Sequence, residues 1–469
     1  MKKGIKKITA FMMLALAFGS CSKYLDINES PNGAVEPPIS GLLAHSTYAT
    51  AYTTFDVSNI TSYYAQYLAS SGPGSDLDTY NDIDASSTWS YIYDAMTDMN
   101  RMRGIAISKN LAAYVAVADI LTAYNLSITT NLWGDIPYSE AFQGVTNFLP
   151  KYDDQKTIYD SCLLLLNRSI TTLGDPSLDG QIPASADFIH GGNIAAWVKT
   201  AYLIKARLLN EISKQPEYDP AAVLAALANS YTSNDDDAQV TQFDGNGPWV
   251  QVAYNNSVLL LDGWLSAYFV NATNETIYGN YDPRLPAITD PTESGDYQGT
   301  VNGAGRTGSG TSHGECYLML DKWYSIPGSP LQIATYVEAK FMESEAQFRS
   351  GNKTEAYAAY LDGITANMKK LNLADSSITR YTTLPSVAVG AANLTLALIM
   401  KEKYIGCFLM PVTWDDMRRM DYAYPDFTLP VDSHLPSFIR RVNYPAVEIS
   451  TNGANVPNVE LTDHLWWDK

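Results

Sequence analysis

Two glycine-containing strings in the chain have the spacing of catalytic or cofactor-binding motifs. Residues 310–314 read Gly-Thr-Ser-His-Gly and match G-x-S-x-G, in which a strained strand-to-helix turn exposes a nucleophilic serine. Residues 303–308 match G-x-G-x-x-G, which places a dinucleotide pyrophosphate at a helix N-terminus. Both motifs need a strand before and a helix after, and the flanking Gly- and Ser-rich sequence predicts neither. We therefore expect no cofactor and no enzyme activity, and a surface serine hydrolase using Ser312 is the less favoured alternative.

The sequence predicts no metal site. The five histidines are scattered, and no H-x-x-x-H or C-x-x-C pair occurs, so the ligand spacing of a zinc site is missing. Asp175 and Asp179 resemble the start of an EF-hand loop, but Ala186 stands where the bidentate glutamate should be.

Aromatic residues in loop-rich, polar sequence offer a different chemistry, because the C–H faces of a pyranose ring stack on aromatic rings. Neighbouring Asn, Asp and Arg side chains can then bond the sugar hydroxyls. The candidate ligand-binding residues are Trp89, Trp249, Tyr278, Tyr281, Tyr297, Trp323 and Tyr324. Each of them has an alternative interpretation as a core anchor. By contrast, we interpret Trp133, Trp197, Trp414, Trp466 and Trp467 as packing residues and Arg284 as a structural ion-pair partner.

The elements that must position these residues are mostly helices. Apolar residues at steps of three and four between Tyr357 and Leu371 predict one helix, with Thr354 as its N-cap. A second predicted helix precedes Gly351, a residue suited to a left-handed helix end. Ala346 and Ala356 flank this turn where a tetratricopeptide hairpin needs small side chains. One hairpin cannot bury its own apolar face, so further helices must stack on it.

The same periodicity predicts other helices along the chain, whereas residues 232–332 form a loop-rich region with one short helical candidate at 259–270. The predicted helical segments are 40–70, 89–102, 114–128, 157–172, 197–212, 219–231, 332–371 and 393–420. We expect residues 40–469 to form a single domain, mainly α in class. Loops carry binding residues more often than packed helices do, so the loop-rich region is the expected ligand-binding half.

The N-terminus has the pattern of a lipoprotein signal. Four lysines precede the short apolar run 8–18, and Gly-Ser leads into Cys21. Residues 1–20 are therefore predicted to be a signal peptide, Cys21 the lipid anchor and residues 21–39 a tether. Contact with the membrane is expected through this N-terminal lipid only. Three further cysteines cannot make a disulfide framework, and Cys162 and Cys407 are predicted to be buried free thiols.

The chain is acidic, with a net charge of −19 over 469 residues. Such a surface repels phosphate backbones, so we expect no nucleic acid partner. Hydrophobic residues make up 46% of the chain, which is enough for a large core.

Several motifs in order resemble the SusD/RagB family of Bacteroidota surface lipoproteins, in its SusD-like branch. They are YLDINESPN after Cys21, NLWGDIPYSEAF at 131–142, DFIHGGNIAAWVKTAYLIKARL at 187–208, YDPRL at 281–285, EAKFMESEAQFRSG at 338–351, WDDMRR at 414–419 and FIRRVNYPAVEISTNGANV at 438–456. The resemblance implies tetratricopeptide-like hairpins beside an irregular ligand-binding half. It also implies an outer-membrane, surface-facing protein that binds oligosaccharide for a SusC-like TonB-dependent transporter. Part of the family binds peptide instead, and the sequence does not separate the two ligands.

Overall fold

The computed structural model describes residues 36–469 apart from 260–261 and 310–311. Residues 39–469 form one compact unit. The predicted signal peptide, Cys21 and most of the predicted tether lie outside the described residues.

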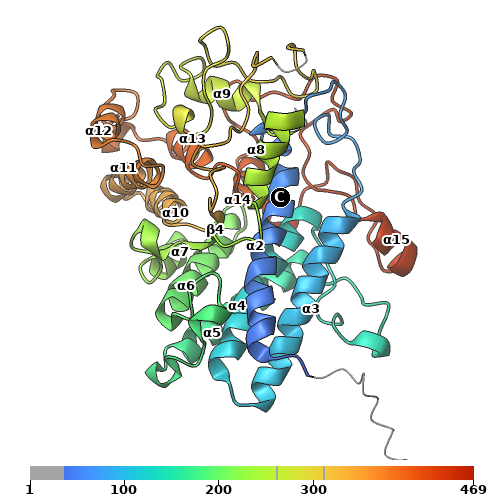
Figure 1. The fold of residues 1–469 in the computed structure, drawn as a ribbon. Helices are drawn as coiled ribbons and strands as arrows, with labels where there is room; N and C mark the ends of the chain where they lie inside the picture. Colours follow the sequence, from blue (N-terminus) through green and yellow to red (C-terminus); the bar gives the residue numbers. More distant parts are fainter. Residues whose placement is uncertain (1–35, 260–261, 310–311) are drawn as a thin grey trace, which may run out of the picture. The chain divides into compact units, whose positions relative to one another are not determined.

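The first half of the compact unit is built from antiparallel helices that each pack against the next (Figure 1). They are α2 (Ile39–Tyr64), α3 (Ser86–Ser108), α4 (Ala112–Trp133), α5 (Gln155–Leu173), α6 (Ile194–Glu211) and α7 (Pro220–Leu227). The helix α4 is long and apolar enough to cross a membrane, but neighbouring helices bury most of it. It is the central core helix, and its Asn125 is bonded inside the core to Thr50 and Thr53 of α2.

The predicted hairpin forms as α10 (Tyr336–Arg349) and α11 (Lys353–Lys370). Gly351 turns the chain at φ +84°, and Ala346 and Ala356 are fully buried, as predicted. The Ser344 hydroxyl of α10 donates to the Ala356 carbonyl at 2.8 Å, which shows how closely the two helices approach. The prediction that Thr354 is the N-cap is wrong. The N-cap is Asn352, two residues earlier, and no side chain caps the helix.

The second half contains shorter elements joined by long loops. Two small antiparallel sheets pair β1 (Leu68–Ala69) with β3 (Trp264–Leu265) and β2 (Ala238–Val240) with β4 (Leu331–Ala334). The remaining helices are α8 (Pro248–Leu259), α9 (Ala267–Thr273), α12 (Asp375–Thr382), α13 (Leu396–Gly406), α14 (Val412–Arg419) and α15 (Ala446–Asn452). Single 3₁₀ turns occur at Gly144–Thr146, Pro176–Leu178, Ala184–Ala186, Asn234–Asp236, Leu285–Ala287, Ala391–Asn393 and Trp466–Asp468.

Two predicted helices differ from the observed ones. The prediction of a single helix at 259–270 is wrong, because β3 lies within this range and separates α8 from α9. The candidate at 393–420 divides into α13 and α14, since residues 407–411 form a turn. Short apolar runs carry no periodicity that would distinguish a buried helix from a buried strand.

The glycines of the G-x-G-x-x-G string pack loops together. A Cβ on Gly303, at φ +82°, would lie 2.0 Å from the Val431 carbonyl oxygen. The Gly303 N–H donates to the buried carboxylate of Asp78 at 2.7 Å. A Cβ on Gly305 would lie 2.6 Å from the Pro73 nitrogen. Close backbone approach therefore explains this spacing, and among the described residues after it no helix that could receive a phosphate begins before α10.

Several predicted core residues have the expected environment. Trp133, Trp197, Trp414 and Trp467 are buried, while Trp466 is half-buried. Arg284 is buried between the carboxylates of Asp282 and Glu402, at 2.6 and 2.5 Å, so its prediction as an ion-pair partner is confirmed. Cys162 and Cys407 are buried free thiols, also as predicted.

Candidate ligand-binding site

Three of the predicted ligand-binding aromatics are buried. Trp249 is 6% exposed, and its ring meets Phe55 edge-on at 4.8 Å. Tyr324 meets Phe408 in the same way at 5.0 Å. Trp249 and Tyr324 line one small cavity of about 10 Å³, which is little more than the space of one water molecule. Trp89 is also buried, but it forms the floor of a much larger cleft described below.

The other four predicted aromatics are half-buried. Tyr281 and Tyr297 lie together with ring centroids 6.1 Å apart. Tyr278 lies under the Lys401 ammonium, which is 5.0 Å from its ring centroid. Trp323 packs on Tyr324 at 4.7 Å. The assignment of these four rings to a ligand platform remains a prediction. Two of the four, Tyr281 and Tyr297, lie together, and Trp323 packs on the buried Tyr324.

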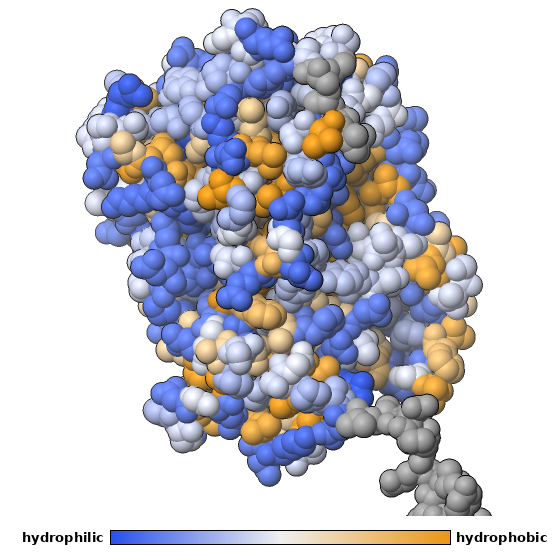
Figure 2. All heavy atoms as spheres, in the orientation of Figure 1, coloured by the Kyte–Doolittle hydropathy of each residue, from blue (hydrophilic) through white to orange (hydrophobic). Residues whose placement is uncertain are grey.

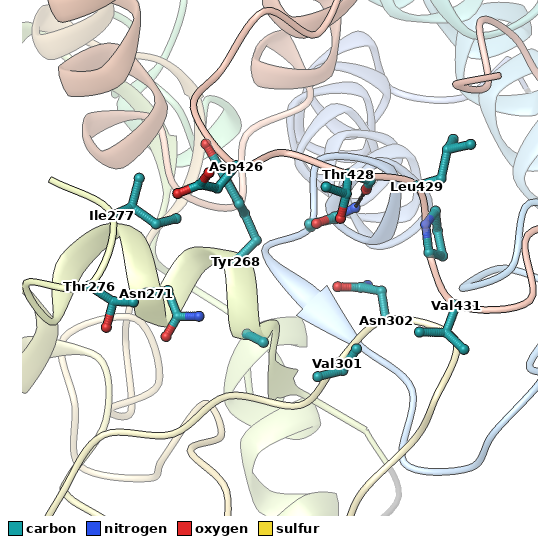
Figure 3. Close-up of a pocket in the computed structure, with 13 residues that line it drawn as sticks. Tyr268, Asn271, Thr276, Ile277, Val301, Asn302, Asp426, Thr428, Leu429 and Val431 are labelled. Carbon is teal, nitrogen blue, oxygen red and sulfur yellow. Dashed lines mark hydrogen bonds between the residues drawn. The ribbon is translucent and has the colours of Figure 1, made fainter.

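One cavity in the loop-rich half, here called the loop pocket, has a volume of about 240 Å³ (Figure 3). Its walls come from α9, from the loop at 301–302 and from residues 426–431. Much of its polar capacity is used inside the protein. The Asn302 amide donates to the Leu68 carbonyl at 2.9 Å and also binds Asp78. Tyr268 is its aromatic wall, and at 6% exposure that ring offers little face for stacking.

A larger cleft of about 500 Å³ lies between α3, the loop after α4 and α15; we call it the α3 cleft. Its α3 wall is Trp89, Ser90, Tyr93, Asp94 and Thr97. Its other lining residues are Pro137, Ala141, Phe142, Gln143, Gly144, Asn147, Phe148, Pro150, Val447 and Glu448. Figure 2 shows hydrophobic atoms on the side of the compact unit where α15 and the loop after α4 lie.

The α3 cleft contains a row of aromatic rings. Trp89 packs on Tyr93 with centroids 4.7 Å apart, and Tyr93 stacks on Phe142 at 6.2 Å. The Tyr93 hydroxyl donates to the Pro137 carbonyl at 2.8 Å, which fixes the ring against the loop. At the rim, Phe148 is 73% exposed. An exposed ring beside rigidly held ones is the arrangement that a stacking ligand needs.

Polar side chains border this aromatic row. Asp94, Thr97 and Gln143 are exposed at the cleft, which leaves them accessible to ligand hydroxyls. Glu448 of α15 accepts a hydrogen bond of 2.8 Å from the Tyr152 hydroxyl. Burial, and next the charge of Glu448, raise the pKa of Tyr152, so its hydroxyl stays a neutral donor. A row of rings with carboxylate and amide groups beside it suits a sugar better than a phosphate.

Sequence reasoning predicted Trp89 but missed Tyr93, Phe142 and Phe148. A signal was present, because residues 134–154 form a long segment between two periodic helices that is rich in Pro, Gly and aromatic residues. Loops of that length without regular structure are uncommon unless they are functional.

The structure gives Ser312 no catalytic setting. The Ser312 hydroxyl has no hydrogen-bond partner among the described residues, so no serine–histidine pair is formed there. No helix begins between Ser312 and α10. Within the described part of the chain, no group of three or more His, Cys, Asp or Glu side chains could hold a metal ion.

The fold and the clefts define a mainly helical protein of tetratricopeptide-like hairpins with a loop-rich half. The SusD-like family described as "Starch-binding associating with outer membrane" matches residues 31–445. The chain belongs to this SusD-like family, which confirms the resemblance and the predicted fold class.

Solved structures agree with this fold. A SusD/RagB family protein from Bacteroides thetaiotaomicron is 21% identical, with 92% of this chain and 99% of that chain covered and a TM-score of 0.76. A chitin-binding SusD homologue from Flavobacterium johnsoniae is 19% identical, with 91% and 98% covered and a TM-score of 0.76. Another chitin-binding protein is 21% identical, with 92% and 100% covered and the same TM-score of 0.76. No curated protein matches the chain.

Proposed function

We propose that the protein is a non-catalytic outer-membrane lipoprotein that binds oligosaccharide in the α3 cleft for uptake. The observation that carries the proposal is the exposed Phe148 ring at the mouth of a cleft whose floor is Trp89, Tyr93 and Phe142. The family description as starch-binding supports a glycan ligand, as do the chitin-binding structures of similar fold.

The test is calorimetric titration of the soluble protein lacking residues 1–21 against a panel of neutral and acidic oligosaccharides, followed by Phe148→Ala. Loss of a key aromatic contact costs about 2 kcal/mol, so affinity should fall roughly thirtyfold. Tyr254→Ala is the matched control, because Tyr254 is 47% exposed and lies on α8, outside the α3 cleft. A short peptide library belongs in the same panel. Binding of peptides without any glycan would replace this proposal with the peptide alternative.

The membrane role is proposed from the sequence and the family. Cys21→Ala should abolish labelling by a fatty-acid analogue and block signal cleavage by the lipoprotein peptidase. Co-purification of the lipidated protein with a SusC-like TonB-dependent transporter should be retained in Phe148→Ala, since ligand binding and docking are separate contacts. Labelling of Cys21→Ala by the analogue would rule out this anchor.

The absence of hydrolysis is a further part of the proposal. A fluorophosphonate probe should fail to label the protein, because Ser312 lacks a hydrogen-bonded base among the described residues. Labelling that disappears in Ser312→Ala would instead favour the hydrolase alternative.

A further inference from the structure

A second cavity adjoins the α3 cleft and differs from it in charge. This cavity, here called the arginine cavity, has a volume of about 270 Å³ and is lined by side chains of α3, α4 and α5. Phe142 lines both the arginine cavity and the α3 cleft, so one ring forms part of the boundary between them. The two spaces therefore have one aromatic wall residue in common.

Two arginines in the arginine cavity share a single carboxylate. The Arg103 Nε donates to Asp119 Oδ1 at 2.7 Å, and the Arg168 Nε donates to Asp119 Oδ2 at 2.8 Å. The Arg168 Nη2 lies 2.7 Å from the same Oδ2. Asp119 is 1% exposed, whereas the side chains of Arg103 and Arg168 are 31% and 42% exposed. Both oxygens of the acid are thus bonded within the protein, while both arginine side chains stay partly exposed.

The charge balance of this cavity is unusual for the molecule. One arginine suffices to neutralise Asp119, so the second contributes a surplus positive charge in a chain whose net charge is −19. Among the described residues that line the cavity, Asp119 is the only acid. Each guanidinium carries five N–H donors, and the contacts with Asp119 use only some of them.

Neutral groups complete the walls. Asn100, Thr122 and Ser161 line the cavity beside the two arginines, and Tyr138 closes one side. Burial raises the pKa of Tyr138, so its hydroxyl remains a neutral group that does not repel an anion. The cavity therefore offers guanidinium donors for a carboxylate and amide or hydroxyl groups for the ring hydroxyls of a sugar.

We infer that the arginine cavity binds the carboxylate of an acidic sugar, so that the ligand of the α3 cleft is a glycan containing uronic acid. This inference rests on the proposed function. A guanidinium can bind a carboxylate through two parallel N–H bonds, and such charge-assisted bonds are about twice as strong as neutral ones. Because Phe142 lines both spaces, the guanidinium donors lie in the cavity that adjoins the stacking surface. A purely structural role, tying α3 and α5 to Asp119 of α4, would not distinguish an acidic ligand from its carboxyl-reduced form.

The first experiment varies the ligand. Oligogalacturonate, alginate and hyaluronan fragments are titrated by calorimetry into the soluble protein, together with the same oligosaccharides after reduction of their carboxyl groups. Reduction should weaken binding of the recognised fragment by at least about tenfold, because a charge-assisted pair is lost. Binding of neutral glycans alone would overturn the uronate inference and leave the proposed function standing. Binding of no glycan at all would remove both.

The second experiment varies the protein. Arg168→Gln should weaken binding of the recognised acidic fragment about tenfold. The carboxyl-reduced fragment should bind to this variant as tightly as to wild type. Lys156→Gln is the matched control, because Lys156 is a cation on the same helix that pairs with Asp160 outside the cavity. Arg168→Lys keeps the positive charge but not the paired N–H donors of the guanidinium, so it should bind the acidic fragment more tightly than Arg168→Gln and less tightly than wild type. Equal binding by Arg168→Gln and wild type would contradict the inference. A thermal melt checks that each variant is folded. The comparison of acidic with carboxyl-reduced oligosaccharides uses wild type alone, so it does not depend on the folding of any variant.

Discussion

The Arg419 guanidinium and the Glu345 carboxylate form a fully buried ion pair that joins α14 to α10. The distances from Nη1 to Oε1 and from Nη2 to Oε2 are both 2.5 Å, and neither side chain is exposed. Arg349 also contacts Glu345, at 2.9 Å, and Asp416 contacts Arg419 at 2.7 Å. Burial opposes ionisation of Glu345. The charge and hydrogen bonds of Arg419, together with the charges of Arg349 and Lys403, outweigh burial and hold the pKa of that carboxyl well below its ordinary value.

Removing the charge of Glu345 should therefore destabilise the fold strongly. Glu345→Gln leaves Arg419 buried with an incomplete set of partners, and breaking a buried pair typically costs about 3–5 kcal/mol. Urea unfolding monitored by circular dichroism measures the change. Glu343→Gln, two residues away in the half-exposed pair with Lys340, should cost less than about 1 kcal/mol. Equal losses in the two variants would contradict this account of the α10–α14 junction.

Ala346 tests the packing of α10. The residue is fully buried in the main hydrophobic core, so Ala346→Leu must overpack its surroundings at a cost of about 1–3 kcal/mol. The exposed Ala358 of α11 provides the matched substitution, Ala358→Leu, which should leave the melting temperature nearly unchanged. A melting temperature of Ala346→Leu equal to that of wild type would show that α10 is not closely packed at this position.

Glu211 should make the stability depend on pH. Its carboxyl is 2% exposed, accepts a bond of 2.8 Å from the Tyr159 hydroxyl and has no partner for Oε1 among the described residues. Burial, and next the charge of Asp415, raise the pKa of Glu211 above its ordinary value of 4.5. The folded state therefore holds a proton that the unfolded state releases near pH 4.5, and stability falls as pH rises above that value.

The variant Glu211→Gln carries no titratable group at this position, so it should lose less stability than wild type between pH 5 and pH 8. The difference in slope is at most about 1.4 kcal/mol per pH unit. Urea unfolding at each pH gives both curves, and Glu217→Gln, on the exposed segment after α6, is the control. Parallel curves for wild type and Glu211→Gln would show that Glu211 ionises normally in the folded state.

The sequence predicted the helical half well and the loop-rich half only in part. Local backbone geometry determines which residue types suit a helical hairpin, as at Ala346, Gly351 and Ala356, and the hairpin is present as predicted. The aromatic residues have no such local rule. Trp249 stands in polar, loop-like sequence, yet it lies on α8 and is covered by Phe55 of α2, which is almost two hundred positions earlier. Exposure of a ring depends on which distant element covers it, and a single sequence does not contain that information.

Trp249 and Trp323 should consequently behave differently on truncation. Trp249→Ala removes a buried ring and should cost about 3–5 kcal/mol of stability. Trp323→Ala removes a half-buried ring and should cost less. Thermal melting separates the two variants, and ligand titration of Trp323→Ala tests whether its accessible face belongs to a platform. A Trp249→Ala variant that melts like wild type would show that its ring is not part of the core.

The central claim is that the α3 cleft is the ligand-binding site. The most direct measurement is the affinity of the recognised oligosaccharide for wild type, Phe148→Ala and Asn271→Ala, the last of which alters the loop pocket instead. Phe148 is 73% exposed, so its truncation should leave the melting temperature unchanged while affinity falls roughly thirtyfold. Asn271→Ala should bind as wild type does. Unchanged binding by Phe148→Ala together with loss of binding by Asn271→Ala would place the ligand in the loop pocket and contradict the claim.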